Sequence, residues 1–452
     1  MQKSVRTVVS AFAKKAREFR KDQRGNIAMM LGLSIIPMIL AAGSAIDFSR
    51  IANSKANLVA GLDASALYAA AITGKSEADL KVLARSYFDA NYNSTSDAPV
   101  TDFDLKNYAD KVVVTGTVDV KTWFMSVGGI THVSAPASSE VKKTGSSIEV
   151  SLVLDQTGSM TGTKLANLKV AAKDFIDTVV WDEQTPYFSK AGLVPFTFAV
   201  NPGSYAAAAR GTIAAGTSTT PGSANFKFKD GANTNRTFPI TNCVSERVGS
   251  NAYTDAAASA SKVGRVYASS TTACNNIPAI VPLTSDRTLL KTTIENMVAG
   301  GSTAGEIGMQ WGWFMVSPTI GLWSGSEEPK PYGTDKLKKI VVFMTDGEFN
   351  TAYCNGVLSN DWNGNAGNAS KINCNATNGD PTTQAQSICT AIKAQNITLY
   401  TIGFELDNDT AKTFMKNCAT DSTKAFDAAN SDELKAAFAA IAQNLLSLRV
   451  SK

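Results

Sequence analysis

SIEVSLVLDQTGS, residues 147–159, decides the fold of this chain, because it joins a largely apolar strand to a short polar loop. The helical pattern of residues 164–181 follows at once, with apolar side chains at intervals of three and four. Apolar strands alternating with amphipathic helices predict a parallel sheet that helices cover on both faces. Residues 146–452 are therefore predicted to form one α/β domain with a doubly wound, mostly parallel sheet. The later strands are expected at 191–200, 338–346 and 397–404, and the later helices at 287–298, 306–316, 383–395 and about 432–448.

The loop after the first strand carries Asp155-x-Thr157-x-Ser159, at the carboxyl edge of the predicted sheet, where open α/β sheets bind ligands. Alternate residues can turn one carboxylate and two hydroxyls toward one point, and an all-oxygen set suits a hard divalent cation. Two later strings reach the same edge: GGSTAG with Thr303, before a helix, and TDGE with Asp346, after a strand. Each string alone is equally explained as a helix cap or turn. Three in this order at one edge predict a metal site.

In this order, the three strings resemble the metal-ion-dependent adhesion site of von Willebrand factor A domains. The resemblance implies that Thr157 and Ser159 coordinate the ion directly, whereas Asp155, Thr303 and Asp346 act directly or through water. Thr157 stands where the family usually has a serine, and it keeps the hydroxyl. The expected ion is Mg²⁺, with Mn²⁺ or Ca²⁺ as alternatives.

The composition excludes several classes of protein. The chain has 452 residues, 44% hydrophobic and 18% charged, which suits a globular protein rather than a disordered, collagenous or polytopic membrane one. His132 is the only histidine, so chemistry that needs two imidazoles cannot be built. Eight Lys and Arg fall within residues 1–24, which leaves a mildly acidic remainder and argues against a nucleic-acid partner. We expect no enzyme; a metal-dependent hydrolase is disfavoured because no general base is evident.

Residues 27–46, IAMMLGLSIIPMILAAGSAI, are twenty residues without a charge, about the length that crosses a bilayer as a helix. The basic leader, residues 1–26, precedes them, so the positive-inside rule predicts a single pass with a cytoplasmic N-terminus. A cleaved leader and a buried core helix are the alternatives. Residues 47–145 predict helices followed by a small antiparallel sheet, which is a pilin-like α+β arrangement.

All six cysteines lie in the last half of the chain, on the predicted extracytoplasmic side, where disulfides persist. Four of them fall in two predicted insertions of the α/β domain, residues 202–285 and 350–381, which bridges are expected to hold in place of a core. Buried free thiols and a zinc site are the alternatives. Sequence order and loop membership favour the pairs Cys243–Cys274, Cys354–Cys374 and Cys389–Cys418.

Asp361-x-Asn363-x-Asn365 begins like a calcium-binding loop. Ala366 stands where such a loop needs glycine, and Ile372 where it needs glutamate. We therefore predict that this string is an ordinary loop without a bound ion.

Four further short strings are distributed from end to end of the chain: QRGNIA at 23–28, LDASA at 62–66, WGW at 311–313 with SP at 317–318, and LRV at 448–450. With these strings, the chain resembles TadG-like proteins of bacterial tight-adherence (Flp) pilus assembly systems. The resemblance implies an inner-membrane anchor, a periplasmic or surface-exposed adhesion domain, and contacts with other pilus assembly components. Cleavage of a prepilin type is not predicted, because no glutamate stands five residues after Gly25.

Together these patterns predict a membrane-anchored, extracytoplasmic binding protein. A metal held by oxygen ligands leaves one coordination position open, and we expect an acidic side chain of a protein partner to fill it. The alternative from another class is a structural, minor pilin-like subunit in which the metal only stabilises the fold.

Overall fold

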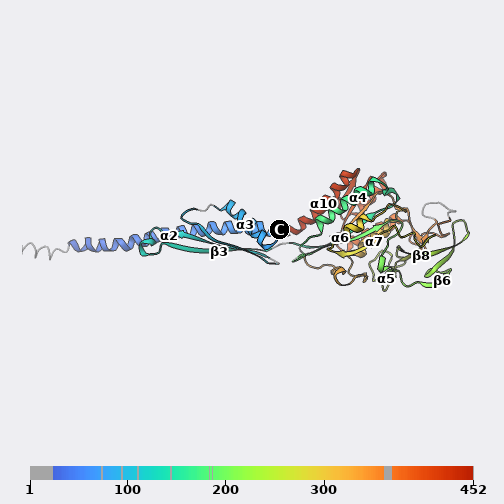
Figure 1. Ribbon diagram of the computed structural model, residues 1–452, viewed down its shortest axis with the longest axis horizontal. Coiled ribbons are helices and arrows are strands. Elements are labelled where there is room, and N and C mark those ends of the chain that lie inside the picture. The colour runs from blue at the N-terminus through green and yellow to red at the C-terminus, as the bar shows by residue number, and fades with distance from the viewer. Residues whose placement is uncertain are drawn as a thin grey trace, which may run out of the picture. The chain divides into compact units, whose positions relative to one another are not determined.

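The computed structural model of the chain describes residues 24–72, 75–92, 95–108, 111–142, 145–182, 184–185, 187–360 and 369–450. The chain divides into two compact units, Met1–Lys143 and Thr144–Lys452, which Figure 1 shows with their helices and strands. Most of the predicted basic leader and the string that begins at Asp361 lie outside the described residues.

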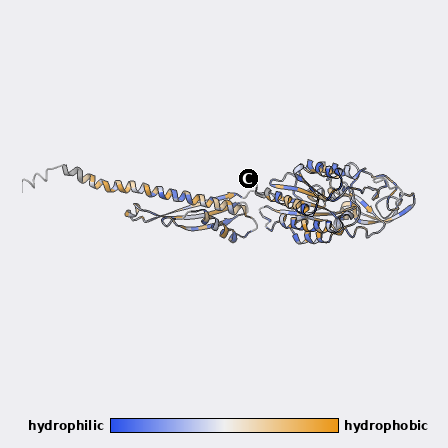
Figure 2. Cartoon of the chain, turned by 90° about the horizontal axis from the view of Figure 1, so that it is seen from above, coloured by the Kyte–Doolittle hydropathy of each residue, from blue (hydrophilic) through white to orange (hydrophobic). Residues whose placement is uncertain are grey.

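The first unit contains one long helix, a second helix and a three-stranded antiparallel sheet in the order β1-β2-β3. In the long helix, α2, the apolar side chains from Met29 to Ile39 are mostly exposed, whereas in its second half Leu58 and Leu62 are buried, next to Phe88 of α3. Figure 2 shows the hydrophobic colour concentrated in that first half. Among the described residues, α2 is the one helix whose length and composition would let it cross a membrane. The bounds are α2 Arg24–Ala71, α3 Glu77–Asn91, β1 Val100–Asn107, β2 Lys111–Lys121, η1 Met125–Gly128 and β3 His132–Lys142.

A six-stranded sheet in the order β10-β5-β4-β11-β14-β15 forms the centre of the second unit. Every neighbouring pair is parallel except β10 with β5. The chain winds from β4 outward to β10, returns, and winds from β11 outward to β15, which confirms the predicted doubly wound α/β fold. The strands are β4 Ser147–Asp155, β5 Ser189–Phe196, β10 Val281–Thr284, β11 Leu337–Thr345, β14 Thr398–Phe404 and β15 Ala425–Ala428.

Helices cover both faces of this sheet, as its apolar strands require (Figure 1). On one face α4, α6 and α10 bury side chains such as Phe175 and Phe438 against the strands. On the other face α7, α8 and α9 do so, with Trp311 and Phe314 of α7 fully buried. The bounds are η2 Gly158–Met160, α4 Thr163–Val179, α6 Arg287–Glu295, α7 Gly305–Val316, η4 Gly325–Glu327, α8 Pro381–Ala394, α9 Asp409–Cys418, η5 Ser422–Lys424 and α10 Ser431–Val450.

The two insertions differ from the expectation that bridges replace a core. Residues 202–285 form a four-stranded sheet, β6-β7-β8-β9, and also supply β10 to the main sheet. Phe226, Phe228 and Phe238 pack with Val357 of the second insertion in an apolar cluster of their own. The expectation of insertions without a core was wrong. The few large apolar side chains are scattered among many small polar residues, so the sequence does not show that they gather in one cluster. The bounds are η3 Gly203–Tyr205, α5 Ala206–Arg210, β6 Ala214–Ser218, β7 Ser223–Lys229, β8 Asn235–Ser245, β9 Gly264–Tyr267, β12 Tyr353–Cys354 and β13 Val357–Leu358.

Three disulfides confirm the predicted pairing of the six cysteines. Cys243–Cys274 and Cys354–Cys374 lie within the insertions. Cys389–Cys418 joins α8 to α9 across the face of the main sheet, at a sequence separation of 29 residues.

Replacing both Cys389 and Cys418 with alanine is expected to lower the free energy of unfolding by about 3 kcal/mol, because the unfolded chain then regains the freedom that the closed loop removes. Urea denaturation of the purified protein measures this loss. A decrease below about 1 kcal/mol would show that the bridge constrains the unfolded chain far less than its loop length implies.

Two glutamates are buried where the insertions meet α7. Glu246 Oε1 accepts a hydrogen bond from the Tyr353 backbone N–H at 2.9 Å. Within the described part of the chain, Glu246 Oε2 and both Glu306 oxygens have no hydrogen-bond donor. Burial raises the pKa of Glu246 to about 7, and burial together with the charge of Glu246 raises the pKa of Glu306 well above its usual value. The fold therefore favours the protonated form of both groups.

A carboxyl group with a raised pKa in the folded state costs stability once it is ionised. For Glu246 the cost is absent below its unfolded pKa of 4.5 and grows until the pH passes about 7. Glu246→Gln should therefore raise the free energy of unfolding at pH 8 by about 3 kcal/mol and change it little at pH 4. Urea denaturation across this pH range is the measurement. Glu328→Gln, at an exposed glutamate, is the control. An equal change in unfolding free energy in both variants would contradict the raised pKa of Glu246.

Candidate metal centre

Two adjacent parallel strands bring the predicted metal loops together. Asp155 is the last residue of β4 and Asp346 follows the last residue of β11, and the two strands pair in register up to Leu154 and Met344. From β4 the chain passes to α4 on one face, and from β11 it passes to α8 on the other. The loops therefore separate at the point where the strand order reverses, which is where doubly wound sheets bind ligands.

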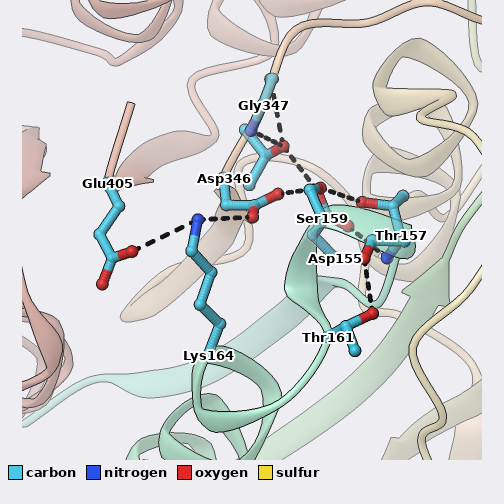
Figure 3. Close-up of polar contacts among 10 residues, drawn as sticks. Asp155, Thr157, Ser159, Thr161, Lys164, Asp346, Gly347 and Glu405 are labelled. Atoms are coloured by element: carbon cyan, nitrogen blue, oxygen red, sulfur yellow. Dashed lines mark hydrogen bonds and ion pairs between the residues drawn. The ribbon is translucent and has the colours of Figure 1, made fainter. Parts of the chain in front are cut away.

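Four of the five predicted residues form one hydrogen-bonded group, which Figure 3 shows in close-up. Ser159 Oγ donates to Asp346 Oδ1 at 2.6 Å and lies 3.0 Å from Thr157 Oγ1. Asp155 Oδ1 accepts from the Thr157 backbone N–H at 2.7 Å, and Asp155 Oδ2 accepts from Thr345 Oγ1 at 2.6 Å. Two carboxylates and two hydroxyls from loops far apart in sequence thus meet at one edge of the sheet.

The loop that carries Thr303 lies beside the first loop. The Gly158 N–H donates to the Gly301 carbonyl at 3.0 Å, and the Gly300 N–H donates to the Gln156 carbonyl at 2.9 Å. Gly301 has φ of 81°, and a Cβ there would lie 3.0 Å from the Phe198 ring, so this turn favours glycine.

Thr303 itself is bound to the third loop through its backbone. Its N–H donates to Asn350 Oδ1 at 2.9 Å, and its carbonyl accepts from the Asn350 N–H at 3.0 Å. Within the described residues, no hydrogen bond joins the Thr303 side chain to the other four predicted ligands. The structure thus brings Thr303 to the same edge, but outside the hydrogen-bonded group.

Two charged residues that the sequence analysis did not identify complete the site. Lys164 Nζ, from the first turn of α4, lies 3.0 Å from Asp346 Oδ2 and 3.4 Å from Glu405 Oε2 (Figure 3). Glu405 follows β14 at the same sheet edge, so the rule that identified Asp155 and Asp346 would also have found it. No sequence pattern marks Lys164, because its role depends on the reach of a long side chain.

The carboxylates of the site outnumber its cations. Lys164 offers one positive charge to Asp346 and Glu405, and Asp155 is fully buried with no cation of the described residues among its contacts. Burial, and secondly the charge of Asp346, raise the pKa of Asp155 to about 6. An added cation would relieve this excess of negative charge.

The donor set fits a hard divalent cation, because it consists of carboxylate and hydroxyl oxygens. Among the described residues, no group of three or more His, Cys, Asp or Glu side chains could hold a metal. The candidate ligands Thr157 and Ser159 therefore matter as much as the carboxylates. Ser159 is exposed while Asp155, Thr157 and Asp346 are buried, so the group opens to solvent at Ser159.

Solved structures that are similar to this chain include pilus proteins and a matrix protein of the mussel byssus. The von Willebrand factor domain of the type V pilus tip protein Mfa5 from Porphyromonas gingivalis has 12% identity and a TM-score of 0.39, with 68% of this chain and 97% of that chain covered. The pilus adhesin RrgA from Streptococcus pneumoniae has 9% identity, a TM-score of 0.39, and coverage of 78% and 50%. A mussel byssus protein, PTMP1, with a zinc-occupied MIDAS motif, has 15% identity, a TM-score of 0.34, and coverage of 68% and 48%.

Another similar structure is the pilus adhesin SpaC from Lactobacillus rhamnosus GG, with 13% identity, a TM-score of 0.36, and 77% of this chain covered. The match covers 34% of that chain, so this chain spans about a third of its length. No curated protein matches the chain in sequence. One family profile, described as "Putative Flp pilus-assembly TadE/G-like", matches residues 25–71. Over α2, the chain is therefore similar to the TadE/G-like family of Flp pilus assembly, which bears out the resemblance of the strings at 23–28 and 62–66. The strings at 311–318 and 448–450 lie outside this match.

Proposed function

We propose that this protein is a membrane-anchored adhesion component of a Flp-type pilus system, and that its second unit binds a protein partner through a divalent cation. The observation that carries this proposal is the oxygen group of Asp155, Thr157, Ser159 and Asp346 at the point where the strand order reverses. The family profile over residues 25–71 supports the pilus system.

The cation is Mg²⁺, with Mn²⁺ or Ca²⁺ as alternatives, held by the four oxygen-bearing residues with Thr303 as a nearby fifth. When bound, it neutralises the buried carboxylates and offers a coordination position to an acidic side chain of the partner. The exposed Ser159 marks the side from which that partner arrives. Lys164 keeps Asp346 oriented by holding its Oδ2, so that Oδ1 faces the hydroxyls.

The anchor of this proposal is the apolar first half of α2, residues 27–46, as a single pass through the bacterial inner membrane. The basic residues before it favour a cytoplasmic N-terminus and a second unit in the periplasm or at the cell surface. Other pilus assembly components are the expected neighbours of the first unit.

A structural subunit is the second candidate, and the first unit favours it. A long N-terminal helix that packs on an antiparallel β1-β2-β3 sheet is a pilin-like arrangement. In that case the cation would stabilise the second unit without recruiting a partner.

Millimolar Mg²⁺ should raise the free energy of unfolding by about 1 to 3 kcal/mol if its Kd is below a millimolar, and a chelator should reverse the gain. Ser159→Ala and Asp346→Asn should both lose this response, since each removes a ligand. Thermal melting of the purified chain with Mg²⁺ and then with chelator is the measurement. Asp407→Ala, at an exposed carboxylate after β14, is the matched control and should respond like the wild type.

Adhesion and structure can be separated with the Ser159→Ala protein in cells. Adhesion predicts that pili still assemble while capture of the protein partner is lost, and that a chelator abolishes the capture by wild type. A pull-down with and without chelator, alongside a count of assembled pili, measures both. Normal capture by a folded Ser159→Ala protein would favour the structural subunit.

A further inference from the structure

The connection between β2 and β3 forms an apolar tip. Residues 122–131, TWFMSVGGIT, contain no charged residue and include the short helix η1. Trp123 is 53% exposed, Val127 is 77% exposed and Ile130 is 48% exposed. Three large apolar side chains on one exposed turn are unusual for a surface in water, and such a patch is typical of a surface that contacts a protein or a membrane.

A buried carboxylate fixes the tip to α2. Asp47 accepts hydrogen bonds from the backbone N–H groups of Trp123, Phe124 and Met125, at 2.9, 2.8 and 2.8 Å. Three bonds to one carboxylate hold the start of η1 against the helix with little freedom. The tip therefore stays at the level of Asp47 along α2.

Phe124 extends this contact into the apolar half of α2. A Cβ at Gly43 would lie 2.3 Å from the Phe124 ring, so the ring rests directly on the backbone of Gly43. Gly43 belongs to the charge-free residues 27–46. The tip thus overlaps the last turn of the apolar stretch.

Charged groups begin one turn further along. The Arg50 guanidinium lies 3.7 Å above the Trp123 ring and donates from Nη1 to the Lys121 carbonyl at 3.0 Å. Ile46 and Phe48 of α2 are exposed beside the tip. At a membrane–water interface, apolar groups are followed by aromatic rings at the boundary and then by basic groups. The tip and the neighbouring part of α2 show the same order.

We propose that residues 122–131 are a second membrane contact, in which Trp123, Val127 and Ile130 enter the interfacial layer of phospholipid beside α2. This inference rests on the proposed anchor, because it needs residues 27–46 to span the bilayer. Since the tip is fixed to α2 at Gly43 and Asp47, a span that ends near Ile46 brings the tip to the headgroup level. The contact fixes the rotation of α2 about its axis, which a lone apolar helix leaves free.

The test uses the full chain in two sets of vesicles, one of phosphatidylcholine brominated near the headgroup end of its acyl chains, which reports on the tip, and one brominated near their methyl end, which reports on the middle of α2. In the described part of the chain no cysteine is free, so an introduced cysteine can carry a polarity-sensitive fluorophore. The variants are Val127→Cys at the tip, Ile36→Cys in the apolar half of α2, and Val82→Cys as a control of similar exposure. Val82 lies on α3, which packs against α2 near Gly61, roughly 20 Å beyond Ile46 at the helical rise per residue.

The probe at Val127 should shift to the blue and lose most of its emission to brominated lipid, whereas the probe at Val82 should do neither. Quenching at Ile36 without quenching at Val127 would overturn the tip contact and leave the anchor intact. A blue shift at Val127 that brominated lipid does not quench would place the tip against protein and also overturn it. Lack of quenching at Ile36 by lipid brominated near the methyl end would instead refute the anchor.

Discussion

The parallel pairing of β4 with β11 is the constraint on which the second unit depends. It joins segments 190 residues apart, so that Thr345 donates to Asp155 across the two strands. Both strands are buried on both faces, and the pairing can form only when helices cover them. The same pairing places Asp155 and Asp346 side by side at the sheet edge, so the fold and the candidate metal centre have one origin.

Much of this was predictable from sequence, for a geometric reason. Parallel strands end at the same edge of a sheet, so the residues at the ends of two adjacent strands lie close together. Asp155 and Asp346, at the ends of β4 and β11, are such neighbours. The helices that separate the strands were also recognisable, because their apolar residues repeat at helical spacing. Pairing cysteines that share an insertion was correct for Cys243–Cys274 and Cys354–Cys374, and it left Cys389 with Cys418 as the third pair.

The rest depended on contacts that no local pattern encodes. Thr303 reaches the right edge, but hydrogen bonds to Asn350 decide where its backbone lies. Lys164 contacts both Asp346 and Glu405 because the first turn of α4 lies within reach of the two carboxylates. The insertion cluster around Phe226 forms between two segments far apart in sequence, and periodicity within either one cannot show that they meet.

The bridge between Cys389 and Cys418 has a mechanical consequence. The residues it encloses include β14, an inner strand that pairs with β11 on one side and β15 on the other. If tension is applied to the C-terminal end of the chain, α10, β15 and the residues up to Cys418 can be peeled away first. At Cys418 the load passes through the sulfur–sulfur bond to α8, and β14 stays outside the stretched path. The strand β14, which pairs with β11 beside Asp346, is thereby shielded from a pull on that end.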